Sequence, residues 1–140
     1  MIKNNEKIKA AAAPLRIMTM TDLVACLGAG KGTWNEVVKL IRAESWGKVF
    51  LVTNDFGKAK FSEHFPGILA EFVIVDDLLP TDQVAQAIAN QLQGKTEFSE
   101  VAVNMASGSG NLHMALLAAL LKLGAGIRLV VTSEQGVKEL

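Results

Sequence analysis

Five short apolar runs separated by helical patterns constrain the fold of this chain more than any other feature. The runs cover residues 23–27, 49–53, 71–75, 101–103 and 127–132, and the helical patterns cover residues 33–45, 55–65, 81–93 and 109–123. Strands that alternate with helices of these lengths form a parallel sheet with helices on both faces. Right-handed crossovers then give a Rossmann-like α/β three-layer sandwich, with a mainly parallel sheet of about five or six strands in the order 3-2-1-4-5.

The length and composition indicate one folded domain. The chain has 140 residues, half of them apolar, which is enough for one domain with its own hydrophobic core. We expect residues 1–20 to be a leader or an edge element, and residues 21–140 to form a single Rossmann-like domain. The 14 basic and 14 acidic residues balance, which argues against a strongly basic surface that coats nucleic acid.

The cysteine, histidine and hydropathy patterns exclude several other classes of protein. Cys26 is the one cysteine, so no disulfide forms within the chain, and two widely spaced histidines complete no zinc pattern. No run reaches the roughly 18 uninterrupted apolar residues that a membrane helix needs. We therefore expect a cytoplasmic protein with no membrane partner, no metal ion and no cofactor.

Polar residues mark the expected starts of three helices. Thr33 and Glu36 have the spacing of a capping box, in which each side chain binds the backbone amide of the other. Thr81 is expected to cap the helix that follows the third strand, and Ser109 or Asn111 to cap the helix that follows the fourth.

Two loops rich in small residues follow the first and fourth strands. In the order 3-2-1-4-5 these strands are neighbours at the switch point, where open α/β sheets bind ligands. Glycines let a ligand approach the backbone, helix N-termini favour anions, and Lys31 adds a positive charge. The sequence therefore predicts a site for a phosphate-bearing ligand, with no catalytic residue, formed by Gly28, Ala29, Gly30, Lys31, Gly32, Thr33, Asn104, Ala106, Ser107, Gly108, Ser109, Gly110 and Asn111.

Two enzyme families resemble the first loop alone. Residues 28–33 are similar to the end of the P-loop of adenylate kinases, but Ala25 stands where that loop needs its first glycine. The same glycines also resemble the cofactor loop of methyltransferases that use S-adenosylmethionine, with Asn54 and Asp55 placed to hold a ribose. That family does not usually have a second glycine-serine loop after the fourth strand, and the chain is short for its usual seven strands.

Taken together, the two loops resemble those of the CRISPR-associated Rossmann-fold (CARF) domain. Residues 23–36 match its first motif, a strand, a loop of small residues and a helix, and residues 101–110 match its second, an apolar strand that ends in Asn104 before a turn of small residues. The resemblance covers about residues 21–132. It implies a homodimer that binds cyclic oligoadenylate, an RNA-like second messenger, where the loops of the two subunits meet. Because the sequence ends at Leu140, we expect a standalone domain. The resemblance leaves open a messenger sink, a ring nuclease, a regulator that acts through a separate effector protein, and a relative with another ligand.

The resemblance also bears on catalysis. Some CARF domains are metal-independent ring nucleases, and their second loop often carries a lysine just after its small-residue turn. Gly110 and Asn111 stand at that position here, so the loop offers hydroxyls, an amide and backbone N–H groups but no cation. We therefore expect binding with slow or no cleavage.

The helix at residues 112–123 is apolar on nearly all sides, which indicates a contact beyond the sheet. We expect this contact to be the dimer interface, with Leu116 and Leu120 in it. The nearby polar and aromatic residues have simpler interpretations. We expect His113 to be structural, Trp34 to pack on the sheet, His64 to lie at the surface and residues 76–77 to form a solvated turn.

Overall fold

A computed structural model of the chain describes residues 21–96 and 100–140. In this part the chain forms one sheet of six strands in the order β3-β2-β1-β4-β5-β6, and β1 to β5 are parallel. This confirms the predicted α/β class and strand order, and the prediction for residues 1–20 lies outside the described residues. The elements are β1 (Asp22–Cys26), a short 3-10 helix η1 (Lys31–Thr33), α2 (Trp34–Ala43), β2 (Val49–Thr53), α3 (Asp55–His64), β3 (Glu71–Ile74), α4 (Thr81–Leu92), β4 (Glu100–Asn104), α5 (Gly110–Lys122), β5 (Gly126–Ser133) and β6 (Gly136–Glu139).

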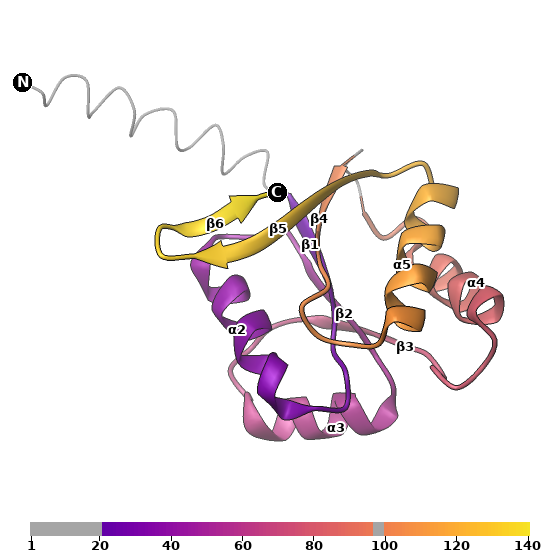
Figure 1. Ribbon diagram of the computed structural model, residues 1–140, viewed down its shortest axis with the longest axis horizontal. Coiled ribbons are helices and arrows are strands. Elements are labelled where there is room, and N and C mark those ends of the chain that lie inside the picture. Colours follow the sequence, from indigo (N-terminus) through magenta and orange to yellow (C-terminus); the bar gives the residue numbers. More distant parts are fainter. Residues whose placement is uncertain (1–20, 97–99) are drawn as a thin grey trace, which may run out of the picture.

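Helices cover both faces of the sheet, which makes the molecule a Rossmann-like three-layer sandwich (Figure 1). Successive residues of a strand point to opposite faces. In β1, Val24 and Cys26 join the core under α4 and α5, whereas Leu23 and Ala25 face the side of α2 and α3. Both faces of the central strands are therefore buried, which is why these strands are apolar throughout instead of alternating with polar residues.

The sixth strand belongs to a hairpin at the C-terminal end of the chain, after the five strands that the sequence indicated. β5 runs past the end of β4, and β6 returns antiparallel to it from Gly136, which has a φ of 103°. Val137 of β6 packs with Val130 and Leu40 against the α2 side of the sheet. The hairpin therefore covers the outer part of α2 and closes that edge of the core.

Two of the three expected helix starts differ from the prediction. Thr33 occupies the N-cap position of α2, but its side chain makes no capping bond, and Glu36 instead accepts a hydrogen bond from the Thr132 hydroxyl. The predicted capping box is therefore wrong. Thr81 does not cap α4, because Pro80 holds the N-cap position. The cap of α5 is Ser109, whose hydroxyl accepts from the backbone N–H of Leu112, as predicted.

The apolar helix α5 divides its leucines differently from the prediction. Leu116 and Leu120 are buried in the core of the subunit, at 0% and 2% exposure, so the expectation that they form a contact between subunits is wrong. They point at the sheet because they lie on the same face of the helix as Leu112 and Ala119. None of the helices in the described ranges is both long and apolar enough to cross a lipid bilayer.

Candidate functional site

The two predicted loops lie against each other at the carboxyl ends of β1 and β4. Ala25 of β1 is in register with Asn104 of β4, so both strands end at the same edge of the sheet. A Cβ atom added to Gly28 would lie 2.8 Å from the backbone nitrogen of Gly108, closer than real Cβ contacts come. The prediction that the two loops are adjacent is therefore correct, and the contact is close enough to require glycine at residue 28.

The Ser107 side chain ties the first loop to the second. Ser107 is buried, and its hydroxyl accepts hydrogen bonds from the backbone N–H of Gly28 and from the hydroxyl of Thr33, both at 2.7 Å. Thr33 does not cap its own helix because its backbone is helical, with a φ of −89° and a ψ of −10°, instead of extended, and its hydroxyl donates across the loops. We call this set of contacts among Ser107, Gly28 and Thr33 the loop clasp.

Ring nitrogens of His113 and Trp34 make hydrogen bonds to the backbone of the loop clasp. Nε2 of His113 lies 2.7 Å from the carbonyl oxygen of Ser107, so the imidazole holds the second loop over the first turn of α5. Nε1 of Trp34 donates to the carbonyl of Gly28 at 2.9 Å, and the rest of that ring is buried. Both residues therefore have the structural roles expected from the sequence.

The five loop glycines fall into two groups. Gly28 and Gly108 are required by packing, since Gly108 has a φ of 101° and an added Cβ would lie 3.2 Å from Cβ of Cys26. An added Cβ at Gly30, Gly32 or Gly110 would meet no atom within 4 Å. The absence of a side chain at these three positions leaves the loop backbone open to solvent, where a ligand has access to it.

The remaining predicted site residues divide in the same way. Asn104 is buried and shapes the second loop, because its amide donates to the carbonyl of Val130 at 2.8 Å and its oxygen accepts from the N–H of Ala106 at 3.1 Å. Asn111 lies at the surface, where its side-chain oxygen accepts a hydrogen bond from the Thr81 hydroxyl. The exposed members of the predicted site are Ala29, Gly30, Lys31, Gly32, Thr33, Ala106, Ser109, Gly110 and Asn111.

Lys31 places a positive charge beside the open glycines. Its ammonium lies 3.3 Å from Nε2 of His64, at the end of α3. The four ion pairs found among the described residues join other side chains, so the Lys31 ammonium has no carboxylate partner there. His64 is exposed, as expected, but its position beside Lys31 had no signal in the sequence because the two residues are 33 positions apart.

The described residues near this edge include a buried thiol but no cluster of metal-binding side chains. Burial raises the pKa of the Cys26 thiol to about 12, so it stays protonated and is a poor nucleophile. No group of three His, Cys, Asp or Glu side chains is arranged to hold a metal ion in that part. Asp76 accepts from the N–H of Leu78, and Asp77 from the amide of Asn54, which fits the expected turn.

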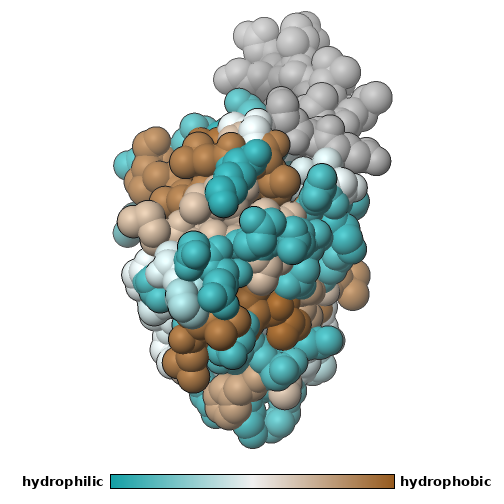
Figure 2. Space-filling model, turned by 90° about the vertical axis from the view of Figure 1, so that its right-hand side faces the viewer, coloured by the Kyte–Doolittle hydropathy of each residue, from teal (hydrophilic) through white to brown (hydrophobic). Residues whose placement is uncertain are grey.

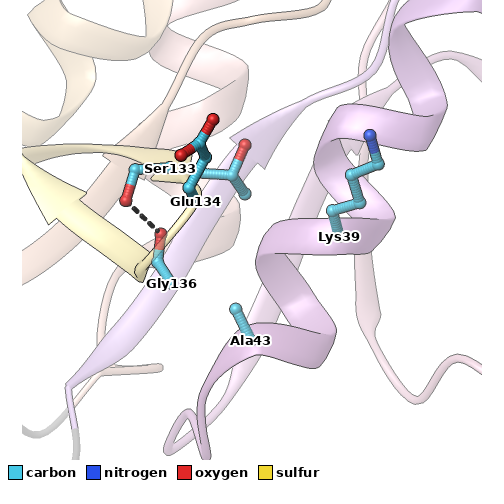
Figure 3. Close-up of a pocket in the computed structure, with 6 residues that line it drawn as sticks. Lys39, Ala43, Ser133, Glu134 and Gly136 are labelled. Carbon is cyan, nitrogen blue, oxygen red and sulfur yellow. Dashed lines mark hydrogen bonds between the residues drawn. The ribbon is translucent and has the colours of Figure 1, made fainter.

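A pocket of about 420 Å³ lies away from the loops, between α2 and the turn that joins β5 to β6. Figure 3 shows Lys39 and Ala43 on α2 facing Ser133, Glu134 and Gly136 of the turn. The turn is held by a hydrogen bond from the Ser133 hydroxyl to the carbonyl of Gly136 at 3.1 Å. This pocket contains none of the loop residues, and no motif in the sequence predicted a ligand there.

Neither a family model nor a curated protein matches this chain. The Rossmann-like fold is established by the strand order and by the helices on both faces of the sheet. The function therefore depends on the chemistry of the exposed residues of the two loops, residues 29–33, 106 and 109–111, which we call the loop surface.

Proposed function

We propose that this chain is a sensor domain of the CARF type that binds a cyclic oligoadenylate as a homodimer and serves CRISPR defence. The observation that carries the proposal is the loop clasp. Because Ser107 binds both Gly28 and Thr33, the two loops form one continuous surface at the switch point between β1 and β4. Open α/β sheets bind their ligands at this place.

The chemistry of the loop surface favours a ligand with phosphate groups. Lys31 supplies a positive charge with no carboxylate partner in the described residues, next to the open backbone of Gly30 and Gly32. On the other loop, Ser109 caps α5, and the first N–H groups of a helix have no partner within it. A phosphate at that end would meet backbone donors and the positive end of the helix dipole.

A second subunit would complete the binding surface. The loop residues of one subunit are largely exposed, and a cyclic oligonucleotide presents repeated phosphates that suit two symmetric copies of the same loops. The outer face of α5 offers apolar side chains for the contact, with Met114 63% exposed and Leu121 67% exposed. Figure 2 views the molecule from the side of α4 and α5 and shows hydrophobic patches between polar groups. The proposed contact therefore uses this outer face, in place of Leu116 and Leu120.

Features of the same loops weigh against the two enzyme alternatives. A P-loop wraps a phosphate with a long loop after its strand, but β1 here extends through Ala25 to Cys26, and the N–H of Gly28 is already bound to Ser107. A methyltransferase would use the end of β2 for the ribose, but Asn54 there caps α3 and donates to Asp77. The second loop carries no cation, so we propose binding with slow or no cleavage.

Binding and assembly together test the proposal. Isothermal titration calorimetry with cyclic tri-, tetra- and hexa-adenylate should give saturable binding of one ring per two chains. Linear oligoadenylate should bind more weakly, because the ring holds its phosphates in a fixed arrangement. If S-adenosylmethionine or ATP with Mg²⁺ saturates the protein and no cyclic oligoadenylate binds, the sensor proposal is refuted and the corresponding enzyme alternative is favoured.

A further inference from the structure

We infer that His64 is the second phosphate-binding side chain of the loop surface and that it binds as the imidazolium, so that ligand binding takes up a proton. The inference rests on the proposed phosphate site and adds a residue and a regulation to it. Its basis is the contact of 3.3 Å between Nζ of Lys31 and Nε2 of His64. Two groups able to carry positive charge are thus brought together from η1 and α3.

The hydrogen-bond partners of the imidazole indicate which of its nitrogens carries the hydrogen. Nδ1 of His64 lies 2.8 Å from the carbonyl oxygen of Lys60, which only accepts, so Nδ1 carries the hydrogen. The Lys31 ammonium only donates, so Nε2 must accept from it. In this arrangement the Nε2 lone pair of His64 faces the Lys31 ammonium.

An anion changes which proton arrangement is favoured. A phosphate oxygen also only accepts, so Nε2 of His64 must carry a hydrogen to bind it. While Nδ1 keeps its own hydrogen for the carbonyl of Lys60, a hydrogen on Nε2 makes the ring an imidazolium. Without an anion, the imidazolium and the Lys31 ammonium would repel each other, whereas a phosphate between them attracts both. Phosphate binding and protonation of His64 therefore favour each other, and this coupling is reciprocal.

Among the described neighbours of His64, Lys31 is the charged side chain that most directly affects the protonation of the ring. On α2, the ring of Trp34 packs edge-on against the imidazole, with centroids 6.1 Å apart, and carries no charge. On α3 itself, Lys60 and Glu63 face each other at 3.9 Å and balance in charge. Lys31 from η1 is the charged side chain in direct contact with the ring.

Calorimetry with two probes tests the inference, at pH 6 and pH 8 and in buffers of different ionisation enthalpy. The probes are inorganic pyrophosphate and cyclic tetra-adenylate. Wild type should bind cyclic tetra-adenylate about tenfold more tightly at pH 6 than at pH 8, where a free imidazole is mostly neutral. A tenfold change over two pH units corresponds to an average uptake of about half a proton per phosphate site. Pyrophosphate itself titrates in this range, so its proton uptake is taken only as the difference between wild type and His64→Gln. His64→Gln should bind about tenfold more weakly than wild type at pH 6, since it loses a charge-assisted hydrogen bond, and should take up no proton with cyclic tetra-adenylate.

Two further variants separate charge from folding. His64→Lys supplies a permanent cation, so it should keep the wild-type affinity of pH 6 at both pH values without proton uptake. Lys58→Ala removes a neighbouring cation of α3 that lies over the Phe72 ring, 5.7 Å from its centre, and should bind like wild type. Thermal unfolding of each variant checks that the fold is retained.

The outcomes distinguish this inference from the proposed function. If cyclic tetra-adenylate binds His64→Gln as tightly as wild type, or with the same proton uptake, the role of His64 is refuted and the sensor stands. Proton uptake that persists in His64→Gln would have to come from another group, such as His113, the one other histidine of the chain. If pyrophosphate alone binds, with uptake that depends on His64, the phosphate pair is supported and the cyclic oligoadenylate sensor is refuted. If neither probe binds wild type, both are refuted.

Discussion

Gly28 and Gly108 approach so closely that a Cβ on Gly28 would lie 2.8 Å from the backbone nitrogen of Gly108. These residues are 80 positions apart in the chain, and their contact brings together the loops that follow β1 and β4. Backbone cannot move aside as the end of a flexible side chain can. The close approach and the hydrogen bonds of Ser107 therefore hold the loop surface in one arrangement before any ligand binds.

Replacing Gly28 by alanine should disturb this contact. The added methyl group would overlap the Gly108 backbone, and overpacking of this kind lowers the free energy of unfolding by about 1–3 kcal/mol. Gly30→Ala is the matched control, because Gly30 has a φ of −83° and open space around it, so its effect should stay within about 0.5 kcal/mol. Chemical denaturation measures both, and equal stabilities for the two variants would contradict the described loop contact.

Ser107→Ala should destabilise the protein through the backbone it leaves unpaired. The N–H of Gly28 would lose its acceptor at a partly buried position, which lowers the free energy of unfolding by about 1–3 kcal/mol. Thr33→Ala removes one exposed hydroxyl and should lower it by only about 0.5–1.5 kcal/mol. The double variant should lose less than the sum, since both changes break the same bond, and additive losses would show that the Thr33–Ser107 bond contributes nothing.

The sequence predicted the elements of the fold better than the contacts between them. Apolar runs and the glycines after them located β1, β4 and both loops, because these features depend on local periodicity and backbone freedom. The predicted capping box failed because Thr33 has helical backbone angles instead of the extended angles of an N-cap residue, and its hydroxyl donates to Ser107. β6 was not located because its four residues include Lys138 and Glu139 and carry little apolar signal. His64 lies beside Lys31 because of how α3 packs in the folded chain, and no local sequence pattern predicts that packing.

Lys31→Ala should weaken a phosphate-bearing ligand while leaving the unliganded protein intact. Loss of a charge-assisted hydrogen bond should reduce the binding free energy of cyclic tetra-adenylate by about 1–3 kcal/mol. Lys31 is exposed and forms no ion pair with another described residue, so the melting temperature without ligand should hardly change. Calorimetry tests the loss of affinity, and a thermal melt tests the unchanged stability. Unchanged affinity would show that the phosphate site does not include the first loop.

The Cys26 thiol should make stability fall in alkaline solution. Its pKa is raised by burial from 9.0 to about 12, so the folded state disfavours the thiolate. Below pH 9 the thiol is protonated in both states and its contribution to stability is complete. Between pH 9 and pH 12 the unfolded chain ionises first, and that contribution falls by up to about 1.4 kcal/mol per pH unit. Wild type should therefore lose stability relative to Cys26→Ala over this range, and parallel curves for the two proteins would contradict the burial of the thiol.

The proposed homodimer gives different expectations for the two faces of α5. Met114→Glu and Leu121→Glu change exposed side chains, so each should leave the subunit folded and shift sedimentation velocity from dimer to monomer. Leu116→Glu places a charge in the core of the subunit and should unfold it, which distinguishes a core position from an interface position. The outer-face variants should also bind cyclic tetra-adenylate more weakly, because each subunit would supply only half of the surface. A wild-type monomer at micromolar concentration that stays monomeric with the ligand bound would refute the dimer, and a dimer unaffected by both outer-face variants would move the interface to another surface.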